Sequence, residues 1–307
     1  MTPGSREMAE HAVPGAGTAF PSAGRMSDAA MAWRRFSSHR LAVVGLAVIL
    51  TLVLLAVFAR MVAPHDPIRQ DLPRALEGPS REFPLGTDEF GRCMLSRILY
   101  GARISLVVGI IATAIGAGAG VILGLVGGYF PRLDGLVMRS MDVLLAFPGI
   151  LLAIAIMAAL GPSLLNVMIA VGIRSIPSFA RVTRSMVLAL KELDFVQGAR
   201  ALGAGHPRVL FRHILPNSVS PLLVFSSLQV ATAILLAAIL SFLGLGVQPP
   251  TPEWGKMVSD GRNYLMEAPH VSLFPGIAIF LTVMGFNCLG DGLRDALDPR
   301  VRGKAAE

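Results

Sequence analysis

The chain has 307 residues, 53% of them hydrophobic and 15% charged, and its mean hydropathy of +0.63 is too high for a soluble domain of this length. A net charge of +7 could suggest nucleic-acid binding, but the positions of the cations in a membrane topology account for it, so no nucleic-acid partner is expected. The composition indicates a membrane protein.

Six apolar runs are long enough to cross a hydrocarbon core of about 30 Å. They cover residues 41–59, 104–127, 143–160, 164–180, 221–246 and 271–289. The fourth run is weakened by Arg174 and Pro177. Because backbone groups in lipid must be hydrogen-bonded within the protein, each run predicts a helix. The predicted fold is an all-α membrane protein with six transmembrane helices.

The segments around these runs set the predicted domain organisation. Residues 1–30 mix Pro, Gly, Ser and Ala without an apolar period, which predicts a disordered cytoplasmic tail. The first run begins too far along the chain for a secretory signal, which favours a retained helix. We expect a first transmembrane helix and an extracytoplasmic segment in 31–103, a five-helix core with a cytoplasmic loop 181–220 in 104–290, and a cytoplasmic tail in 291–307.

Positive charge determines the predicted orientation. Arg34, Arg35, Arg132 and Arg139, together with most cations of the loop 181–220, fall on one side of the membrane when the six spans are threaded. The segment between the first two spans also holds arginines, but acidic residues nearly balance them. Since Lys and Arg concentrate in cytoplasmic segments, both termini and the loop are predicted to be cytoplasmic.

An amphipathic helix is predicted just before the second span. Thr87 or Asp88 can cap it. Its two faces would carry Phe90, Met94, Leu95, Ile98 and Leu99 on the apolar side and Arg92, Ser96 and Arg97 on the polar side. This separation predicts a helix that lies on the outer membrane surface.

Glycine and proline mark features within the spans. Small residues let helices approach closely in lipid, so the glycines of the second span predict tight packing rather than a pore lining. Pro148-Gly149 and Pro275-Gly276 predict kinks in the third and sixth spans. The glycines of the second span are Gly116, Gly118, Gly120, Gly124, Gly127 and Gly128.

The loop between the fourth and fifth spans begins with signals for a short helix. Asp194 with Gln197 predicts a capping box, and Ala199 with Leu202 would form the apolar side. Gly203 is expected to adopt a positive φ and to end this helix.

A second short helix is predicted in the same loop. Pro207 suits its first turn, Val209, Leu210 and Leu215 would form its apolar side, and Pro216 is expected to end it. Two short helices that meet at a bend between apolar spans are typical of a docking loop.

Four polar residues inside the spans are candidates for a translocation path, with interhelical packing as the alternative interpretation: Asn166, Ser227, Gln229 and Asn287. No span carries an acidic residue near its centre, which argues against a proton-coupled mechanism. The sequence has no phosphate-binding P-loop, and its histidines show no metal-ligand spacing. No cofactor or metal is therefore expected, and any ATP must be hydrolysed by a partner.

Two stretches of the chain carry several short motifs each. The first has Gly-Thr-Asp at 86–88, Gly-Arg at 91–92, Leu-Ser-Arg at 95–97 and Gly-Ala-Arg-Ile-Ser-Leu at 101–106. The second has Gln197-Gly198-Ala199, then Gly203, then Leu215-Pro216. Over about residues 31–300 the chain resembles the C-type permeases of dipeptide and oligopeptide ABC importers, and the second stretch resembles their EAA loop. It departs from the family pattern at Gln197, Gly198 and Cys93, where glutamate, alanine and aspartate are usual.

The resemblance implies a type I ABC importer permease fold in the bacterial cytoplasmic membrane, with no catalytic residue in this chain. The EAA loop would dock in a groove of a cytoplasmic ATPase and couple its motion to the membrane helices. The residues that match this loop are Gln197, Gly198, Ala199, Arg200, Leu202, Gly203, Leu215 and Pro216. Implied partners are a second homologous permease subunit, two ATPase subunits or domains, an extracytoplasmic peptide-binding protein and membrane lipid.

The implied substrate is a dipeptide or an oligopeptide. Nickel or another small solute is an alternative, because related importers carry such substrates. Two other classes stay open: an ATP-independent secondary transporter or channel, and a membrane scaffold that recruits a partner. The lack of a central membrane carboxylate argues against the transporter, and the detailed motif at 86–106 argues against the scaffold.

Overall fold

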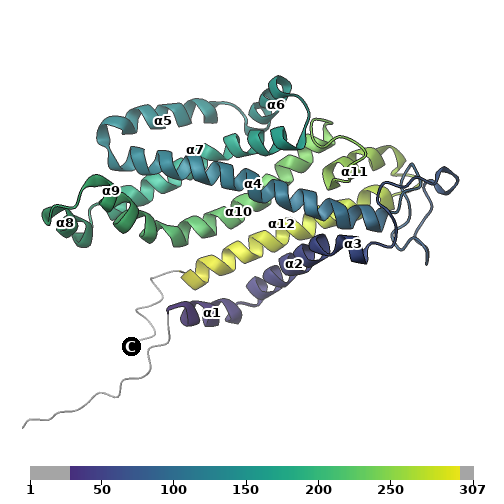
Figure 1. Ribbon diagram of the computed structural model, residues 1–307, viewed down its shortest axis with the longest axis horizontal. Coiled ribbons are helices and arrows are strands. Elements are labelled where there is room, and N and C mark those ends of the chain that lie inside the picture. Colours follow the sequence, from purple (N-terminus) through teal and green to yellow (C-terminus); the bar gives the residue numbers. More distant parts are fainter. Residues whose placement is uncertain (1–27, 298–307) are drawn as a thin grey trace, which may run out of the picture.

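The computed structural model describes residues 28–297, and all regular elements in that part of the chain are helical (Figure 1). Thr87 and Cys93 form an isolated bridge. In chain order the helices are α1 (Asp28–Ser38), α2 (Arg40–Val57), α3 (Ala59–Val62), η1 (Leu72–Arg74), α4 (Met94–Tyr129), α5 (Pro131–Ala146), α6 (Gly149–Leu160), α7 (Leu164–Leu190), α8 (Asp194–Ala201), α9 (His206–Arg208), η2 (Val209–Ile214), α10 (Leu215–Phe242), α11 (Trp254–Gly261), η3 (Arg262–Tyr264) and α12 (His270–Leu297).

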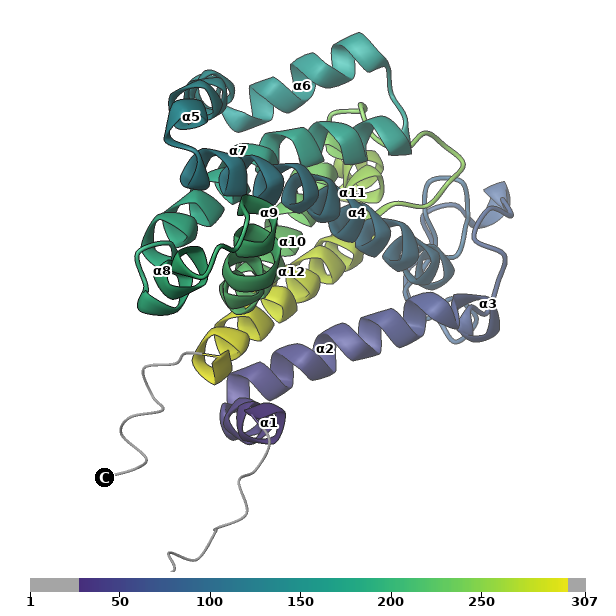
Figure 2. The ribbon, with the colours of Figure 1, turned by 60° about the vertical axis from the view of Figure 1, so that its left-hand side comes forward.

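The long helices run side by side along the long axis of the molecule. α4 packs against α7 and α10, and α12 packs against α2 and α10 (Figures 1 and 2). Within residues 28–297, five helices are long and apolar enough to cross a membrane, namely α2, α4, α7, α12 and the continuous stretch from α9 to α10. The predicted count of six is reached when the bent pair α5–α6 is taken as one more span. The all-α prediction is confirmed.

The third predicted span, 143–160, is not one helix. Its first residues end α5, and the rest forms α6, which is bent away from α5 by 89° and stands out from the bundle in Figure 2. The backbone of Phe147 is extended because a residue before proline avoids the helical region of φ and ψ. Pro148 has no N–H group to donate the next hydrogen bond of helix α5. The predicted kink at Pro148-Gly149 is therefore a full break, whereas Pro275 lies inside an unbroken α12.

Several predicted boundaries are corrected by the helix ends. Helix α1 begins at Asp28, so residues 28–30 are not part of a disordered tail, and residues 1–27 lie outside the described part. Helix α12 reaches Leu297, well into the predicted tail 291–307, of which 298–307 lie outside the described part. Helices α7 and α10 take up both ends of the predicted loop 181–220. The segment between them is 191–214, and we call it the coupling segment.

The predicted surface helix before the second span is not a separate helix, and its second half forms the first turns of α4. Residues 85–93 form turns, in which Asp88 Oδ1 accepts hydrogen bonds from the N–H groups of Phe90 (3.0 Å) and Arg92 (2.9 Å). Helix α4 begins at Met94, and Met94 and Arg97 are both buried. Arg92 Nε and Arg97 Nε lie 2.6 and 3.2 Å from Asp88 Oδ2. The basic side of the pattern thus forms a buried ion-pair cluster instead of facing lipid headgroups.

Four glycines of α4 form a seam against α7. A Cβ atom on Gly120 would lie 2.5 Å from Phe179 Cβ, and one on Gly124 would lie 2.5 Å from the Ala180 carbonyl oxygen. Gly116 and Gly128 approach Ser175 and Val187 in the same way. Real Cβ atoms do not fit at such distances, so only glycine allows this separation of the two backbones. The packing prediction is confirmed for these four positions, while Gly118 faces open space.

The end of the bundle opposite the coupling segment is closed by α11, which follows a buried glutamate. Glu253 is 3% exposed, and its two carboxylate oxygens accept the N–H groups of Gly255 (3.0 Å) and Lys256 (2.9 Å). The neighbouring Trp254 is fully buried, and its Nε1 donates to the Ile98 carbonyl oxygen of α4 at 3.0 Å. Glu253 therefore caps α11, and Trp254 holds α11 on α4. Burial raises the pKa of its carboxyl group.

We expect Glu253→Gln to lower the free energy of unfolding by about 1–3 kcal/mol, the cost of a buried donor without an acceptor. Each oxygen of the Glu253 carboxylate accepts a hydrogen bond from one backbone N–H group. In glutamine one of these oxygens is replaced by an NH₂ group, which cannot accept, so one backbone N–H loses its partner. The thermal unfolding of the purified protein in detergent measures the change. Glu267→Gln, at an exposed glutamate of the same end, is the matched control. Equal unfolding midpoints for the two variants would contradict the capping role.

Candidate functional site

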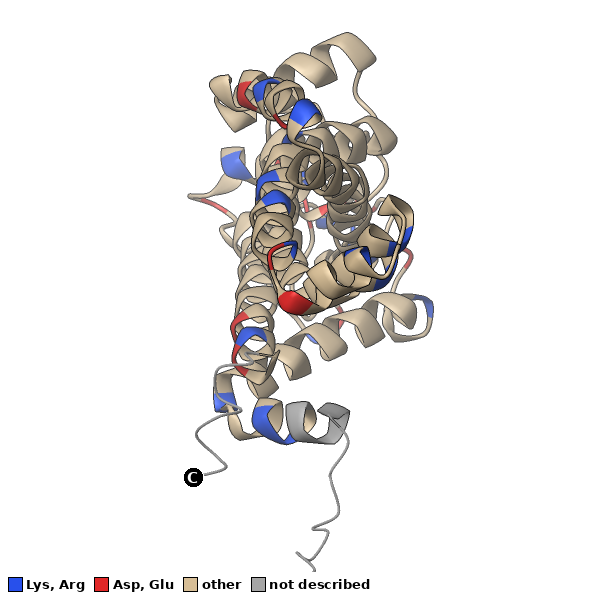
Figure 3. Ribbon diagram, turned by 90° about the vertical axis from the view of Figure 1, so that its left-hand side faces the viewer, with Lys and Arg blue, Asp and Glu red and all other residues tan. Residues whose placement is uncertain are grey.

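The coupling segment, residues 191–214, lies at one end of the helix bundle. Helices α8 and α9 project there, and α1 and the end of α12 lie toward the same end (Figure 1). Figure 3 looks onto this end and shows Lys and Arg distributed over it. A contact between His39 Nε2 and Asp295 Oδ2, 3.4 Å apart, joins the start of α2 to the last turns of α12.

Helix α8 starts without the predicted capping box. Asp194 is the first residue of the helix instead of its cap, and Leu193 at the cap position makes no side-chain hydrogen bond. Gln197 Nε2 donates to the Lys191 carbonyl oxygen at 2.8 Å, which ties α8 back to the end of α7. The side chain predicted to close the capping box thus fixes the angle between the two helices.

Helix α8 ends in a Schellman motif. The Ala204 N–H donates to the Ala199 carbonyl oxygen at 3.0 Å, and the Gly203 N–H donates to the Arg200 carbonyl oxygen at 2.9 Å. Gly203 has a φ of +84°, which confirms the predicted left-handed conformation. A Cβ atom at Gly203 would meet nothing within 4 Å, so glycine is required there by backbone conformation and not by space.

The coupling segment is held to the bundle by an apolar cluster. Val196 is the buried residue of α8. The buried residues of η2 are Val209, Leu210 and Ile214. These side chains pack against Leu125 and Tyr129 of α4 and Val187 of α7.

The predicted apolar sides of the two short helices are confirmed only in part. Val209 and Leu210 are buried as predicted, but the prediction for Leu202 is wrong, since its side chain is 91% exposed. The predicted end of the second helix at Pro216 is also wrong, because α10 begins at Leu215 and runs through Pro216.

A polar contact fixes the other side of the bend. Tyr129 Oη lies 2.9 Å from His206 Nδ1, and the Arg200 guanidinium lies 4.9 Å from the centre of the Tyr129 ring. These contacts join both α8, through Arg200, and α9, through His206, to the last residue of α4. The sequence did not indicate them, because Tyr129 and His206 are 77 residues apart and neither belongs to a motif.

Two further contacts connect the same end of α7 to its neighbours. Arg184 Nε and Nη2 donate to Asp134 of α5 at 2.5 and 2.6 Å. Lys191 Nζ donates to the Gly128 carbonyl oxygen of α4 at 3.3 Å. The ends of α4, α5 and α7 therefore form one unit beneath the coupling segment.

The exposed surface of the coupling segment carries several large apolar side chains among charged residues. Leu202 is 91% and Phe211 63% exposed, and Leu193 and Phe195 are exposed as well. Of the residues predicted for docking, Gln197, Gly198, Leu202, Gly203 and Pro216 are exposed, whereas Ala199, Arg200 and Leu215 are half-buried. The arrangement suits contact with another protein, because exposed leucine and phenylalanine stand on a bend whose opposite side is anchored.

Two of the four residues predicted for a translocation path make local contacts. Asn166 Nδ2 donates to the carbonyl oxygens of Leu160 (2.8 Å) and Gly161 (2.9 Å), which closes the turn between α6 and α7. Ser227 Oγ bonds to its own helix at the Val224 carbonyl oxygen and faces Gly290 of α12.

The other two path candidates lie elsewhere. Gln229 is half-buried on α10. Asn287 is exposed and lines an apolar groove of about 460 Å³ between α10 and α12, next to Leu235 and Asp291. The geometry thus gives Asn166 and Ser227 local structural contacts and leaves Gln229 and Asn287 available.

Comparison with known proteins gives two matching family models. Residues 116–303 match the family described as "Binding-protein-dependent transport system inner membrane component". Residues 27–79 match "N-terminal TM domain of oligopeptide transport permease C".

Individual proteins are similar over most of the chain. The dipeptide transport system permease protein DppC of Alkalihalophilus pseudofirmus is 49% identical over 272 residues, covering 88% of this chain and 90% of the relative. The glutathione transport system permease protein GsiD of Pectobacterium atrosepticum is 50% identical over 272 residues, with the same coverage. A solved amino acid ABC transporter with histidines matches with a TM-score of 0.49 and 16% identity, covering 64% of this chain and 92% of that chain.

The family models and the two permease relatives confirm the predicted family, its type I permease fold and a multi-pass location in the bacterial inner membrane. In this family ATP hydrolysis and substrate capture belong to partner proteins, an ATPase and a binding protein. The chain belongs to the inner membrane components of binding-protein-dependent transport systems, as a C-type permease subunit of an ABC importer.

Proposed function

We propose that this permease takes part in the import of dipeptides or oligopeptides and that the coupling segment is its contact with the ATPase. The observation that carries the second part is the combination of an exposed apolar tip at Leu202 and Phe211 with a fully anchored base. A loop that only rested on the bilayer surface would not need the Tyr129–His206 contact or the buried Val196.

Force on the tip would reach three helices at once. Val196 and Val209 pack on the ends of α4 and α7, and η2 continues without interruption into α10. The ion pair between Arg184 and Asp134 extends the connection to α5. A displacement of α8 would therefore tilt a set of helices instead of one, which is what alternating access requires of a coupling element.

The peptide substrate is inferred from relatives at about half identity. One is named for dipeptide transport and another for glutathione transport, and glutathione is itself a small peptide. Neither of these two relatives is named for nickel transport. Gln229 and Asn287 are our candidates for contact with cargo, and alanine at both should change the uptake rate or substrate range of the assembled importer.

The proposed complex contains a second homologous permease subunit and two ATPase subunits or domains, with a peptide-binding protein on the outer side and lipid around the helices. Helices α5 and α6 expose apolar side chains that such neighbours would cover, including Leu136, Val143 and Leu151. The termini and the coupling segment would face the cytoplasm, in accordance with the positive charge at that end (Figure 3).

The proposal is tested by Leu202→Asp. If Leu202 enters an apolar groove of the ATPase, its loss removes about 1.5–3 kcal/mol of burial, and the aspartate adds a desolvation cost. We expect roughly a tenfold or larger fall in the ATPase that co-purifies with the tagged chain.

Met266→Asp is the matched control, because Met266 is equally exposed, at 97%, and lies between η3 and α12, outside the coupling segment. It should leave co-purification unchanged. Full recovery of the ATPase with Leu202→Asp would remove Leu202 from the docking surface. Repeated isolation of an active wild-type complex without any ATPase would favour the ATP-independent transporter.

A further inference from the structure

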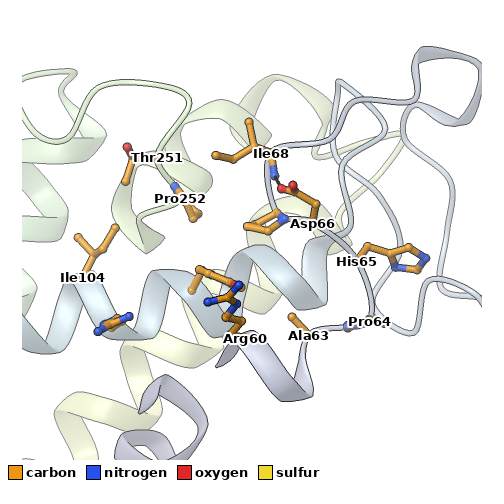
Figure 4. Close-up of a pocket in the computed structure, with 12 residues that line it drawn as sticks. Arg60, Ala63, Pro64, His65, Asp66, Ile68, Ile104, Thr251 and Pro252 are labelled. Atoms are coloured by element: carbon orange, nitrogen blue, oxygen red, sulfur yellow. Dashed lines mark hydrogen bonds between the residues drawn. The ribbon is translucent and has the colours of Figure 1, made fainter. Parts of the chain in front are cut away.

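A hollow of about 630 Å³ opens at the end of the bundle opposite the coupling segment (Figure 4). Four stretches of the chain line it: Arg60 on α3, residues 63–68, Tyr100, Arg103 and Ile104 on α4, and Thr251 with Pro252 before α11. Figure 4 shows Arg60, Asp66, Ile68, Ile104 and Thr251 arranged around one open space. The coupling segment and the proposed path residues take no part in it.

The charge in this hollow is not balanced by the protein. Within residues 28–297, Arg60 and Arg103 have no ion-pair partner, whereas Arg74, Arg92 and Arg97 nearby are all paired with carboxylates. Asp66 is the acidic residue that lines the hollow, and its Oδ1 already accepts the Ile68 N–H at 2.8 Å.

His65 does not add to the charge that faces the space. It turns away in Figure 4 and stacks on Phe83, with ring centres 4.7 Å apart. Two guanidinium groups and one carboxylate leave a formal charge of +1 around the hollow. A monoanion would neutralise it.

The hollow lies where two exposed apolar surfaces end. Arg60 follows the span α2 and stands between Met61, which is 81% exposed, and the exposed Phe58. On α4, Arg103 is followed at helical spacing by the exposed residues Val107 and Ile110. Arginines at such a boundary commonly extend toward the membrane surface. Here both line the same hollow, together with the hydroxyl groups of Tyr100 and Thr251.

We propose that this hollow binds the phosphodiester headgroup of an anionic phospholipid, with the acyl chains on the exposed surfaces of α2–α3 and α4. A guanidinium group binds phosphate through paired, charge-assisted hydrogen bonds, and the two hydroxyl groups can donate to the remaining oxygens. The carboxylate of a peptide offers the same charge, but it would not use the apolar surfaces that lead to both arginines. The site is independent of the cargo proposed above.

The test is native mass spectrometry of the assembled importer after equilibration in nanodiscs that contain equal amounts of phosphatidylglycerol and phosphatidylcholine. The wild-type complex should retain phosphatidylglycerol selectively. Arg60→Gln with Arg103→Gln should reduce that selectivity by roughly tenfold or more, since the charge-assisted hydrogen bonds of both guanidinium groups to the phosphate are lost. Arg81→Gln is the control, at an exposed arginine of the same outer segment that does not line the hollow.

Three results would overturn the proposal. They are equal retention of the two lipids by the wild-type complex, unchanged selectivity in the double variant, and an equal loss in Arg81→Gln. Displacement of the retained lipid by millimolar dipeptide, but not by a dipeptide with an amidated C-terminus, would instead assign the hollow to the carboxylate of the cargo.

Discussion

Gly203→Val should abolish most of the transport activity while the chain still folds and inserts into the membrane. Gly203 has a φ of +84°, a region that costs an L-residue about 1–2 kcal/mol and a β-branched residue more. Either the turn keeps its shape under strain or α8 extends and the Schellman hydrogen bonds are lost. Both outcomes move Leu202 relative to the anchored Val196. We expect peptide uptake by the assembled importer to fall by roughly fivefold to thirtyfold, the factor that corresponds to about 1–2 kcal/mol.

The controls separate backbone strain from side-chain bulk. Gly203→Asn introduces a larger side chain than alanine, but asparagine tolerates the left-handed region, so it should retain more activity than Gly203→Ala. Space does not limit either variant, because a Cβ atom at this position has no neighbour within 4 Å. Normal uptake and normal stimulation of ATP hydrolysis in Gly203→Val would show that coupling does not depend on this bend.

The sequence predicted the parts of the molecule that depend on local or compositional signals. Apolar runs predicted the membrane helices, and the spaced glycines of the second span predicted the close packing that α4 makes with α7. Gly203 gave the positive φ, because few other residues accept that conformation. The family motif gave the function class, which the comparisons confirm.

Features that depend on contacts between distant residues were not predictable in the same way. The pattern from Phe90 to Leu99 fits a surface helix and a buried ion pair equally well, and the carboxylate of Asp88 decides between them. No sequence pattern indicates that Glu253 is buried, because its burial depends on α4 and α11 coming together. The contact between Tyr129 and His206 exists only because the bend at Gly203 returns the chain to α4, and no local pattern indicates it.

The glycine seam leads to a prediction on stability. Gly124→Ala should lower the free energy of unfolding by about 1–3 kcal/mol or more, the usual cost of overpacking, because its Cβ atom would lie 2.5 Å from the Ala180 carbonyl oxygen and 2.6 Å from Thr183 Cβ. Those atoms belong to the backbone and to a β-branched side chain of α7, so they cannot yield without separating the two helices.

Gly118→Ala is the same chemical change on the same helix, six residues away along the chain, and it meets nothing within 4 Å. Alanine is favoured over glycine inside a helix by about 1 kcal/mol, so this variant should unfold at the same temperature as the wild type or above it. Opposite shifts of the two unfolding midpoints in detergent would show that the seam is set by contact and not by helix propensity. Equal shifts would mean that α4 and α7 can move apart freely, and the coupling segment would then have no rigid base on which to act.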